Sequence, residues 1–229
     1  MSMNWLDIIP VRKIVHCGTK AQQDAFKKEY ETLQEMEHPN IVEFLRTEQL
    51  DDDRFGIVME YCRLGDLKKV ILDSSVIYTM NTVVCWGEQL FGAVDYIPPQ
   101  LDETQDPWEQ RKTQQDSHRN DVYSLGLTMW EIIERRNVFS EYGNRCFDRN
   151  GFLDDIILKR FKELSRPECQ DKLGEIVQKC TNFNRSLRPN AQEVVKSLEN
   201  FRKVQKLNKK AVFPKSSQTA RGRGTKWVF

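Results

Sequence analysis

The sequence has no apolar run long enough to cross a membrane, which takes about 20 predominantly apolar residues in a helix. Its opening residues, MSMNWLDIIP, lack the basic start and the long apolar stretch of a secretory signal. The six cysteines form no CxxC pair, so neither a zinc site nor a disulfide framework is indicated. We therefore expect a cytoplasmic protein without a membrane span, whose thiols are reduced.

Acidic residues are missing from residues 202–229, which carry nine Lys or Arg. Removing these nine from the 35 basic residues leaves 26 against 34 acidic residues, so the rest of the chain has a net charge of −8. We expect residues 205–229 to be a flexible basic tail that can contact anionic surfaces such as RNA or anionic lipid. No nucleic-acid-binding motif accompanies it, so we expect no specific nucleic-acid partner.

The composition is otherwise that of a folded protein. Hydrophobic residues make up 39% of the 229 residues and aromatic residues 10%. Such a chain buries a substantial core and is long enough for one large domain or for two lobes.

The first part of the chain predicts a small sheet with one helix. Residues 11–15 predict a strand after Pro10, and residues 20–37 predict a helix that ends before Pro39. Two further strands are predicted at 41–45 and 55–59, on either side of the acidic turn 51–53.

The remainder, beyond a connector at 60–66, predicts a mainly helical lobe. Residues 120–135 form its clearest apolar helix, with Asn120 and Asp121 as the expected cap. Asn190 and Glu193 resemble a capping box at the start of the last helix. The predicted helices are 67–72, 80–96, 120–135, 152–164, 172–180 and 191–204.

Five short motifs follow one another along the chain. In the first, Glu29 lies nine residues before His38-Pro39-Asn40-Ile41-Val42. The others are Ile57-Val58-Met59-Glu60-Tyr61-Cys62, Gly65-Asp66-Leu67, Asp121-Val122-Tyr123-Ser124-Leu125-Gly126 and Arg188-Pro189. Their order resembles the protein kinase family, in which the second-helix glutamate precedes an HPNIV turn, and most closely its tyrosine-kinase-like group, which includes the TGF-β-activated and mixed-lineage kinases.

The resemblance implies an α+β fold: a truncated kinase-like domain with a small sheet and one helix, followed by a mainly helical C-lobe. Residues 1–59 would be the remnant of the N-lobe, 60–66 the hinge, 67–204 the C-lobe and 205–229 the tail. Asp121 and Arg188 would be structural residues of the C-lobe. A vestigial ATP site would comprise Lys13 at the VAIK position, its partner Glu29, the gatekeeper Met59, and Glu60 and Cys62 of the hinge.

The departures from the family pattern concern catalysis. Only twelve residues precede Lys13, too few for the glycine-rich loop that covers the phosphates of ATP. Tyr96-Ile97 is followed at once by Pro98-Pro99-Gln100, which resembles the APE that closes the activation segment. The intervening HRD loop and DFG, very roughly fifty residues, are missing. The similar string at His118 and Arg119 runs straight into an apolar helix, and we expect these two residues in the turn before that helix.

These losses leave no expected catalytic residue and no metal site, so Mg²⁺ is not expected and any binding of ATP would be weak. The resemblance then implies an inactive, pseudokinase-like protein that binds other signalling proteins. The alternative is an incomplete or splice form of an active, ATP-dependent Ser/Thr kinase similar to MAP kinase kinase kinases. Gln100 could still hydrogen-bond Arg188, and Asp121 has either lost its partner or gained one in residues 97–116, which would cover the helices beneath the missing loop.

Overall fold

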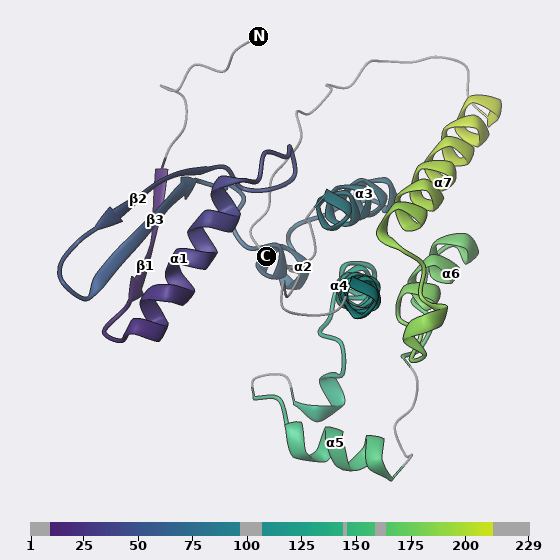
Figure 1. Cartoon of the computed structure of the whole chain (residues 1–229). Coiled ribbons are helices and arrows are strands. Elements are labelled where there is room, and N and C mark those ends of the chain that lie inside the picture. The colour runs from purple at the N-terminus through teal and green to yellow at the C-terminus, as the bar shows by residue number, and fades with distance from the viewer. Residues whose placement is uncertain (1–9, 97–106, 144–145, 159–163, 213–229) are drawn as a thin grey trace. The chain divides into compact units, whose positions relative to one another are not determined.

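The computed structural model describes residues 10–96, 107–143, 146–158 and 164–212, and for 107–117 and 207–212 it describes the backbone alone (Figure 1). The chain divides into two compact units, with the boundary after Leu67. Among the described residues, 10–67 form the first unit and those from 68 to 212 form the second. The architecture is α+β, a small sheet followed by helices, which confirms the predicted fold class.

The first unit is a three-stranded sheet with one helix. Its elements are β1 (Pro10–His16), α1 (Lys20–Gln34), β2 (Phe44–Gln49) and β3 (Arg54–Glu60). The strand order is β1-β3-β2, and β3 pairs antiparallel with both neighbours. β1 and β2 therefore run parallel to each other, and α1 connects them across β3 as in a split βαβ unit.

One face of the sheet forms the core of this unit with α1 (Figure 1). Side chains of a strand alternate between faces, so the residues at every second position of β3 point toward α1. Cys17, Phe26 and Ile57 are buried there, and Phe26 contacts the rings of Tyr30 and Phe55 at centroid distances of 5.4 and 5.3 Å.

The opposite face of the sheet is held by charged side chains. Arg12 reaches across Gly56 and places its Nη2 2.5 Å from Glu48 Oε2, while Arg46 donates to Glu48 Oε1 from Nε and Nη2 at 3.0 and 2.8 Å. A Cβ on Gly56 would lie only 3.0 Å from Cγ and Cδ of Arg12, so glycine leaves room for this crossing. The hydrogen bond from Arg46 is the main reason why the pKa of Glu48 lies below its ordinary value.

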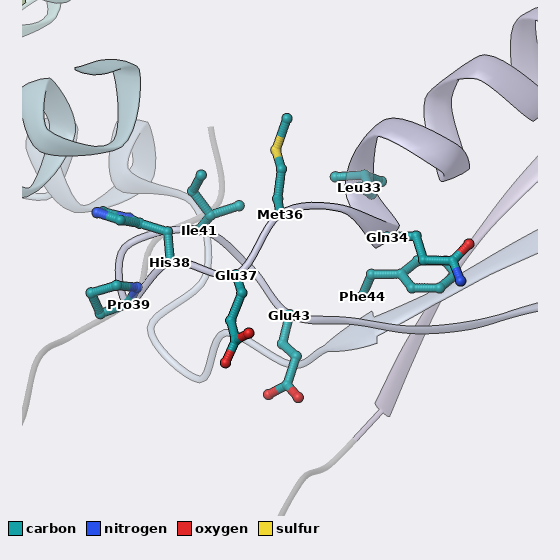
Figure 2. A pocket seen from close by; sticks show the side chains of 9 residues that line it. All are labelled: Leu33, Gln34, Met36, Glu37, His38, Pro39, Ile41, Glu43 and Phe44. Atoms are coloured by element: carbon teal, nitrogen blue, oxygen red, sulfur yellow. The ribbon is translucent and has the colours of Figure 1, made fainter. Parts of the chain in front are cut away.

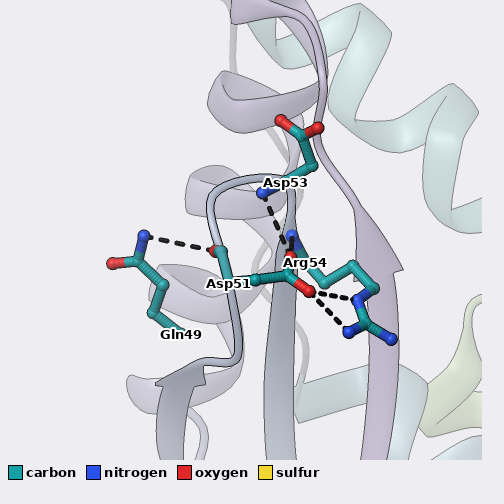
Figure 3. Close-up of polar contacts among 4 residues, drawn as sticks. All are labelled: Gln49, Asp51, Asp53 and Arg54. Atoms are coloured by element: carbon teal, nitrogen blue, oxygen red, sulfur yellow. Dashed lines mark hydrogen bonds and ion pairs between the residues drawn. The ribbon is translucent and has the colours of Figure 1, made fainter.

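The turn between β2 and β3 is organised by Asp51 (Figure 3). Its Oδ1 accepts hydrogen bonds from the backbone N–H of Asp53 (3.2 Å) and of Arg54 (2.7 Å), and its Oδ2 accepts one from Arg54 Nε at 2.5 Å. These bonds, led by that from the Arg54 side chain, lower the pKa of Asp51. The acidic turn predicted at 51–53 is therefore a closed, charge-assisted hairpin loop.

The second unit consists of helices. They are α2 (Leu67–Leu72, which begins at the boundary residue), α3 (Met80–Tyr96), α4 (Pro107–Glu134), α5 (Arg149–Ile157), α6 (Asp171–Cys180) and α7 (Ala191–Val212), with short 3₁₀ turns η2 (Ser140–Tyr142) and η3 (Arg185–Leu187). α3 packs against α4 and α7, and α6 packs against α4 and α7 (Figure 1). None of the helices in the described part combines the length and apolar content needed to cross a membrane.

The centre of this unit lies between α3, α4 and α7. Its fully buried side chains include Phe91, Val122, Met129, Ile132 and Leu198. Gly87 is needed at the crossing of the three helices, because a Cβ there would lie 2.9 Å from Met129 Sδ and 3.0 Å from Leu198 Cδ1. The apolar stripe predicted on residues 120–135 is thus the buried face of α4.

Several predicted boundaries were wrong. α1 ends at Gln34 rather than at 37, because its last turn closes on Glu35, whose N–H reaches the carbonyls of Glu31 and Leu33. β2 begins at Phe44 rather than at 41, since Ile41 closes a turn onto His38 O at 3.1 Å. α5 begins at 149 rather than at 152, because the Asp148 carboxylate caps it by accepting from Gly151 N at 3.0 Å.

The largest corrections concern α4 and α7. α4 starts at Pro107, so Asn120 and Asp121 lie inside the helix and do not cap it, and Pro107 is well suited to a first helical position. α7 continues to Val212, so the first eight residues of the predicted tail are helical. Lysines are good helix formers and are favoured at a helix C-terminus, which accounts for the extension. The capping box at Asn190 and Glu193 is present, with bonds of 3.0 and 2.8 Å.

Candidate functional site

The candidate site in the first unit begins with an ion pair between β1 and α1. Lys13 occupies the middle of β1, paired in register with Ile57, and Glu29 lies on α1. Lys13 Nζ donates to Glu29 Oε1 at 2.6 Å. The structure thus brings together two residues sixteen positions apart that the sequence analysis had paired. Both side chains face solvent in part, with exposed fractions of 53% for Lys13 and 40% for Glu29.

Met59 lies on the same face of the sheet as Lys13. It pairs in register with Val11 on β1 and with Phe44 on β2, and its side chain packs against the core of the first unit. Because strand residues two positions apart share a face, Val11 and Lys13 of β1 stand opposite Met59 and Ile57 of β3. Lys13, Glu29 and Met59 therefore belong to the α1 side of the sheet.

The residues predicted as the hinge form hydrogen bonds with neighbouring residues of the first unit. The N–H of Glu60 donates to Glu43 O at 3.0 Å, and Glu60 Oε2 accepts from Glu43 N at 3.5 Å. Cys62 is buried, and its carbonyl accepts from Gly65 N at 2.9 Å. Gly65 closes this turn with a φ of +68°, a conformation that glycine adopts without strain. Residues 62–65, within the predicted hinge, therefore form a defined turn after β3.

Arg188, predicted as a structural residue, sits in a pocket of carbonyl groups at the start of α7. Its Nε donates to Asn182 O at 2.7 Å, its Nη1 to Arg119 O at 3.2 Å, and its Nη2 to Phe183 O at 3.4 Å. The guanidinium also lies 4.3 Å above the centre of the Tyr123 ring. Burial is the main reason why the pKa of Arg188 is lowered. The expected bond to Gln100 lies outside the described residues.

Residues 118–121 lie within α4, so the prediction that His118 and Arg119 occupy a turn before a helix was wrong. Arg119 has a structural contact, because its Nη1 donates to Ser186 O at 2.5 Å and to Arg185 O at 3.2 Å, which joins α4 to η3. Partial burial raises the pKa of Asp121, and the nearby charge of His118, one turn earlier, acts in the opposite direction. Ten residues, 97–106, separate the end of α3 from the start of α4.

Sequence reasoning missed two features of the first unit. One is the Arg12–Glu48–Arg46 cluster, whose only signal is the two-residue spacing of Arg46 and Glu48 along a strand. The other is a pocket at the end of α1, whose walls come from segments on both sides of the 38–40 turn (Figure 2). No group of three His, Cys, Asp or Glu residues in the described part of the chain is arranged to hold a metal ion.

Comparison with known proteins decides the family. The family model described as "Protein tyrosine and serine/threonine kinase" matches residues 8–100 and 106–198, which is most of the chain. The chain belongs to the protein kinase family. Within that family it is tyrosine-kinase-like, as the motifs around Glu29 and Asp121 predicted.

Two kinase-family relatives match over most of this chain. It is 25% identical over 199 residues to the mitogen-activated protein kinase kinase kinase mom-4 of Caenorhabditis elegans, which covers 69% of this chain and 36% of that protein. It is also 25% identical over 248 residues to the human mixed lineage kinase domain-like protein, covering 85% of this chain and 52% of the relative. The chain thus spans between about a third and about half the length of these relatives.

A shorter match is closer in sequence. The chain is 37% identical over 88 residues to the serine/threonine-protein kinase Nek5 of Mus musculus, a segment that makes up 36% of this chain and 14% of Nek5.

Proposed function

We propose that this kinase-family chain transfers no phosphate and acts by binding other proteins in signalling. The observation that carries the proposal is the short connection between α3 and α4. Only residues 97–106 lie between these helices, and the family match is interrupted between residues 100 and 106. The sequence contains no HRD loop and no DFG at this place or elsewhere. The base and the metal-binding groups of phosphoryl transfer are thus missing from the chain.

The energetic consequence supports inactivity. Phosphoryl transfer relies on positioning and on stabilising the charge that develops on the transferred group, through metal ions and cationic side chains. Loss of a single preorganised stabilising group costs on the order of 10²–10³ in kcat. Lys13, the cation at the position of the family's VAIK lysine, cannot replace the missing base or the missing metal ligands.

A protein-binding role is supported by apolar surface on the second unit. Leu153, Ile157 and Leu158 at α5 have exposed fractions of 40, 73 and 57%. Contiguous exposed apolar side chains of this kind commonly mark interaction surfaces. α5 is itself ordered by an aromatic cluster in which the Phe152 ring lies 5.2 Å from those of Phe139 and Tyr142.

Nucleotide binding is the part of the proposal that is quickest to test. We expect no thermal shift with millimolar ATP, with or without Mg²⁺, because the predicted ATP site is only vestigial. Its residues are Lys13, Glu29, Met59, Glu60 and Cys62. A ligand that binds the folded state raises the midpoint by mass action, so a shift that is lost in Lys13→Met would contradict the vestigial site.

One observation favours a second function, that of a shortened form of an active Ser/Thr kinase. The Lys13–Glu29 pair is intact, with its 2.6 Å contact, which favours a shortened form of an active Ser/Thr kinase. Comparing the transcript with the genomic sequence across the codons for Tyr96 to Pro98 separates these two functions. An intron or a skipped exon at that junction would support the shortened form, and continuous genomic coding sequence would support the inactive protein.

A further inference from the structure

The second unit has a pocket that none of the predicted ATP-site residues lines. It encloses about 440 Å³, which is within the range of small-molecule sites in proteins. Its walls are the start of α3 and part of α7, two helices that lie side by side, together with Gln170, the residue before α6 (Figure 1). All these segments belong to one compact unit, so the pocket depends on no contact with the first unit.

One part of the pocket lining is apolar. Val84 and Phe201 are buried, with exposed fractions of 1 and 8%, and Met80, which also lines the pocket, is partly exposed. A methionine thioether and an aromatic ring both make favourable contacts with a second aromatic ring. Burial adds about 25 cal/mol per Å² of apolar area removed from water. This part of the pocket therefore suits a phenyl or short alkyl group.

The other part of the lining is polar and positively charged. Arg202 and Lys206 line the pocket, and Asp and Glu are absent from its nine lining residues. Gln205 Nε2 donates to Gln170 Oε1, which joins α7 to the residue before α6. An occupant should therefore carry a negative charge next to its apolar group.

Arg202 keeps hydrogen-bond donors available for such a charge. Its Nη1 lies 2.8 Å from Glu88 Oε2 and 3.8 Å from Cys85 Sγ. Within the described part of the chain, its Nε and Nη2 have no hydrogen-bond partner. These two nitrogens form the planar edge of a guanidinium that can bind both oxygens of one carboxylate. The contact with Glu88 holds the guanidinium in place for this role.

The charges around Arg202 fit a single negative charge on the ligand. Glu88 pairs with Arg202, and Lys203 Nζ lies 4.0 Å from Glu199 Oε2. Lys206, whose charge also acts on Glu88, then leaves one positive charge in this group of five residues. A carboxylate carries one negative charge, whereas a phosphomonoester carries nearly two at neutral pH. The charge balance therefore favours a carboxylate.

We propose that this pocket binds a small carboxylic acid, with its carboxylate on Nε and Nη2 of Arg202 and its apolar group against Met80, Val84 and Phe201. Lys206 supplies the remaining positive charge. This site goes beyond the proposed protein-binding function. Because the pocket is shared by the start of α3 and α7, a bound acid contacts both helices and stabilises the folded second unit.

Titration of the full chain with 4-phenylbutyrate, followed by ligand-observed NMR at constant ionic strength, tests the proposal. We expect saturable binding. 4-Phenylbutanol, which has the same ring and chain without the charge, should bind at least about tenfold more weakly. Acetate, which has the charge without the ring, should also bind at least about tenfold more weakly. Equal binding of 4-phenylbutyrate and 4-phenylbutanol would overturn the proposal, as would the absence of saturable binding.

Two exposed lysines of α7 show whether the acid binds in this pocket. Lys206→Gln should weaken the binding of 4-phenylbutyrate about two- to fivefold, which is the effect of one exposed charge. Lys203→Gln is the matched control, because Lys203 does not line the pocket, and it should change the affinity by less than about twofold. Equal effects of the two variants would indicate unspecific charge attraction and would overturn the proposal.

Arg202 is best tested in a chain that already carries Glu88→Gln, so that no buried carboxylate loses its cation. The double variant Glu88→Gln/Arg202→Gln should bind 4-phenylbutyrate at least about tenfold more weakly than Glu88→Gln alone, because the charge-assisted hydrogen bonds are lost. Equal affinities of these two chains would contradict the assigned role of Arg202 and overturn the proposal.

An acetylated Gly-Gly-Phe tripeptide distinguishes a free acid from the end of a partner chain, because its C-terminus also places a carboxylate near a phenyl group. We expect 4-phenylbutyrate to bind at least as tightly as this peptide. Tighter binding of the peptide would overturn the assignment of a small free acid and would identify a chain terminus as the ligand.

Discussion

Lys13 and Glu29 form a direct ion pair, 2.6 Å between Nζ and Oε1, that joins the middle of β1 to α1. Both side chains are more than a third exposed, so solvent screens their attraction, and pairs of this kind contribute about 0.2–1 kcal/mol to stability. The pair predicted from the family motif is therefore present, but it contributes little to the stability of the fold.

A double-mutant cycle measures this contribution. We expect Lys13→Met and Glu29→Gln each to lower the free energy of unfolding by less than about 1 kcal/mol, with a coupling energy in the same range. Urea denaturation of the four proteins in low and high salt provides the values, and the coupling should shrink in high salt. A coupling above about 2 kcal/mol would show that the pair is shielded from solvent.

Arg188 should be far more sensitive to substitution than its exposed counterparts. The guanidinium donates to the carbonyls of Asn182, Arg119 and Phe183 from three different nitrogens and covers the Tyr123 ring, which a lysine ammonium cannot reproduce. We expect Arg188→Lys to cost about 1–3 kcal/mol in the free energy of unfolding. The exposed Arg149 offers the control, since Arg149→Lys should change stability by less than about 0.5 kcal/mol.

The ion pair between α3 and α7 should respond asymmetrically to its two deletions. Arg202 Nη1 lies 2.8 Å from Glu88 Oε2, and Glu88 Oε1 is buried without a hydrogen-bond partner among the described residues. Arg202→Met leaves the Glu88 carboxylate buried without this cation and should cost about 1–3 kcal/mol. Glu88→Gln removes the buried charge and should stay within about 1 kcal/mol of the parent chain.

Glu88 should also make the free energy of unfolding depend on pH. Burial, only partly offset by Arg202, raises the pKa of Glu88 above its ordinary value of 4.5. The folded state therefore binds the Glu88 proton more tightly than the unfolded state does. The stability that this proton adds is fully present at a pH below the ordinary pKa and is lost as the pH rises through the folded pKa. Denaturation curves should show Glu88→Gln gaining stability relative to the parent chain between pH 4 and pH 7. A constant difference over that range would mean that the folded pKa is not raised.

Gly126 sets the distance between α4 and α6. A Cβ at this position would lie 2.7 Å from Cys180 Cβ and 2.9 Å from Thr181 Cγ2. Overpacking in Gly126→Ala should therefore lower the free energy of unfolding of the second unit by about 1–3 kcal/mol. The better helix propensity of alanine should offset up to about 1 kcal/mol of this loss. Gly18 has open space around the corresponding position, so Gly18→Ala is the matched control. Equal midpoints for the two variants in thermal unfolding would refute the close approach.

Local patterns predicted much of this fold because the apolar spacing and the cap residues lie close together in the sequence. The 80–96 helix and the capping box of Asn190 and Glu193 are examples. The start of α4 was not predictable in this way, because its first turns, PWEQRKTQQDSHR, are polar and show no helical stripe. The pairing of Lys13 with Glu29 came from the family motif, whereas the partners of Arg188 depend on tertiary contacts that no spacing reveals.

Incubation with labelled ATP, Mg²⁺ and generic Ser/Thr substrates shows whether the chain transfers phosphate. We expect no incorporation above background, and the same trace for the parent chain and for Lys13→Met, whose ion pair to Glu29 is absent. Incorporation by the parent chain that disappears in Lys13→Met would refute inactivity, because it would mean that Lys13 serves a working active site.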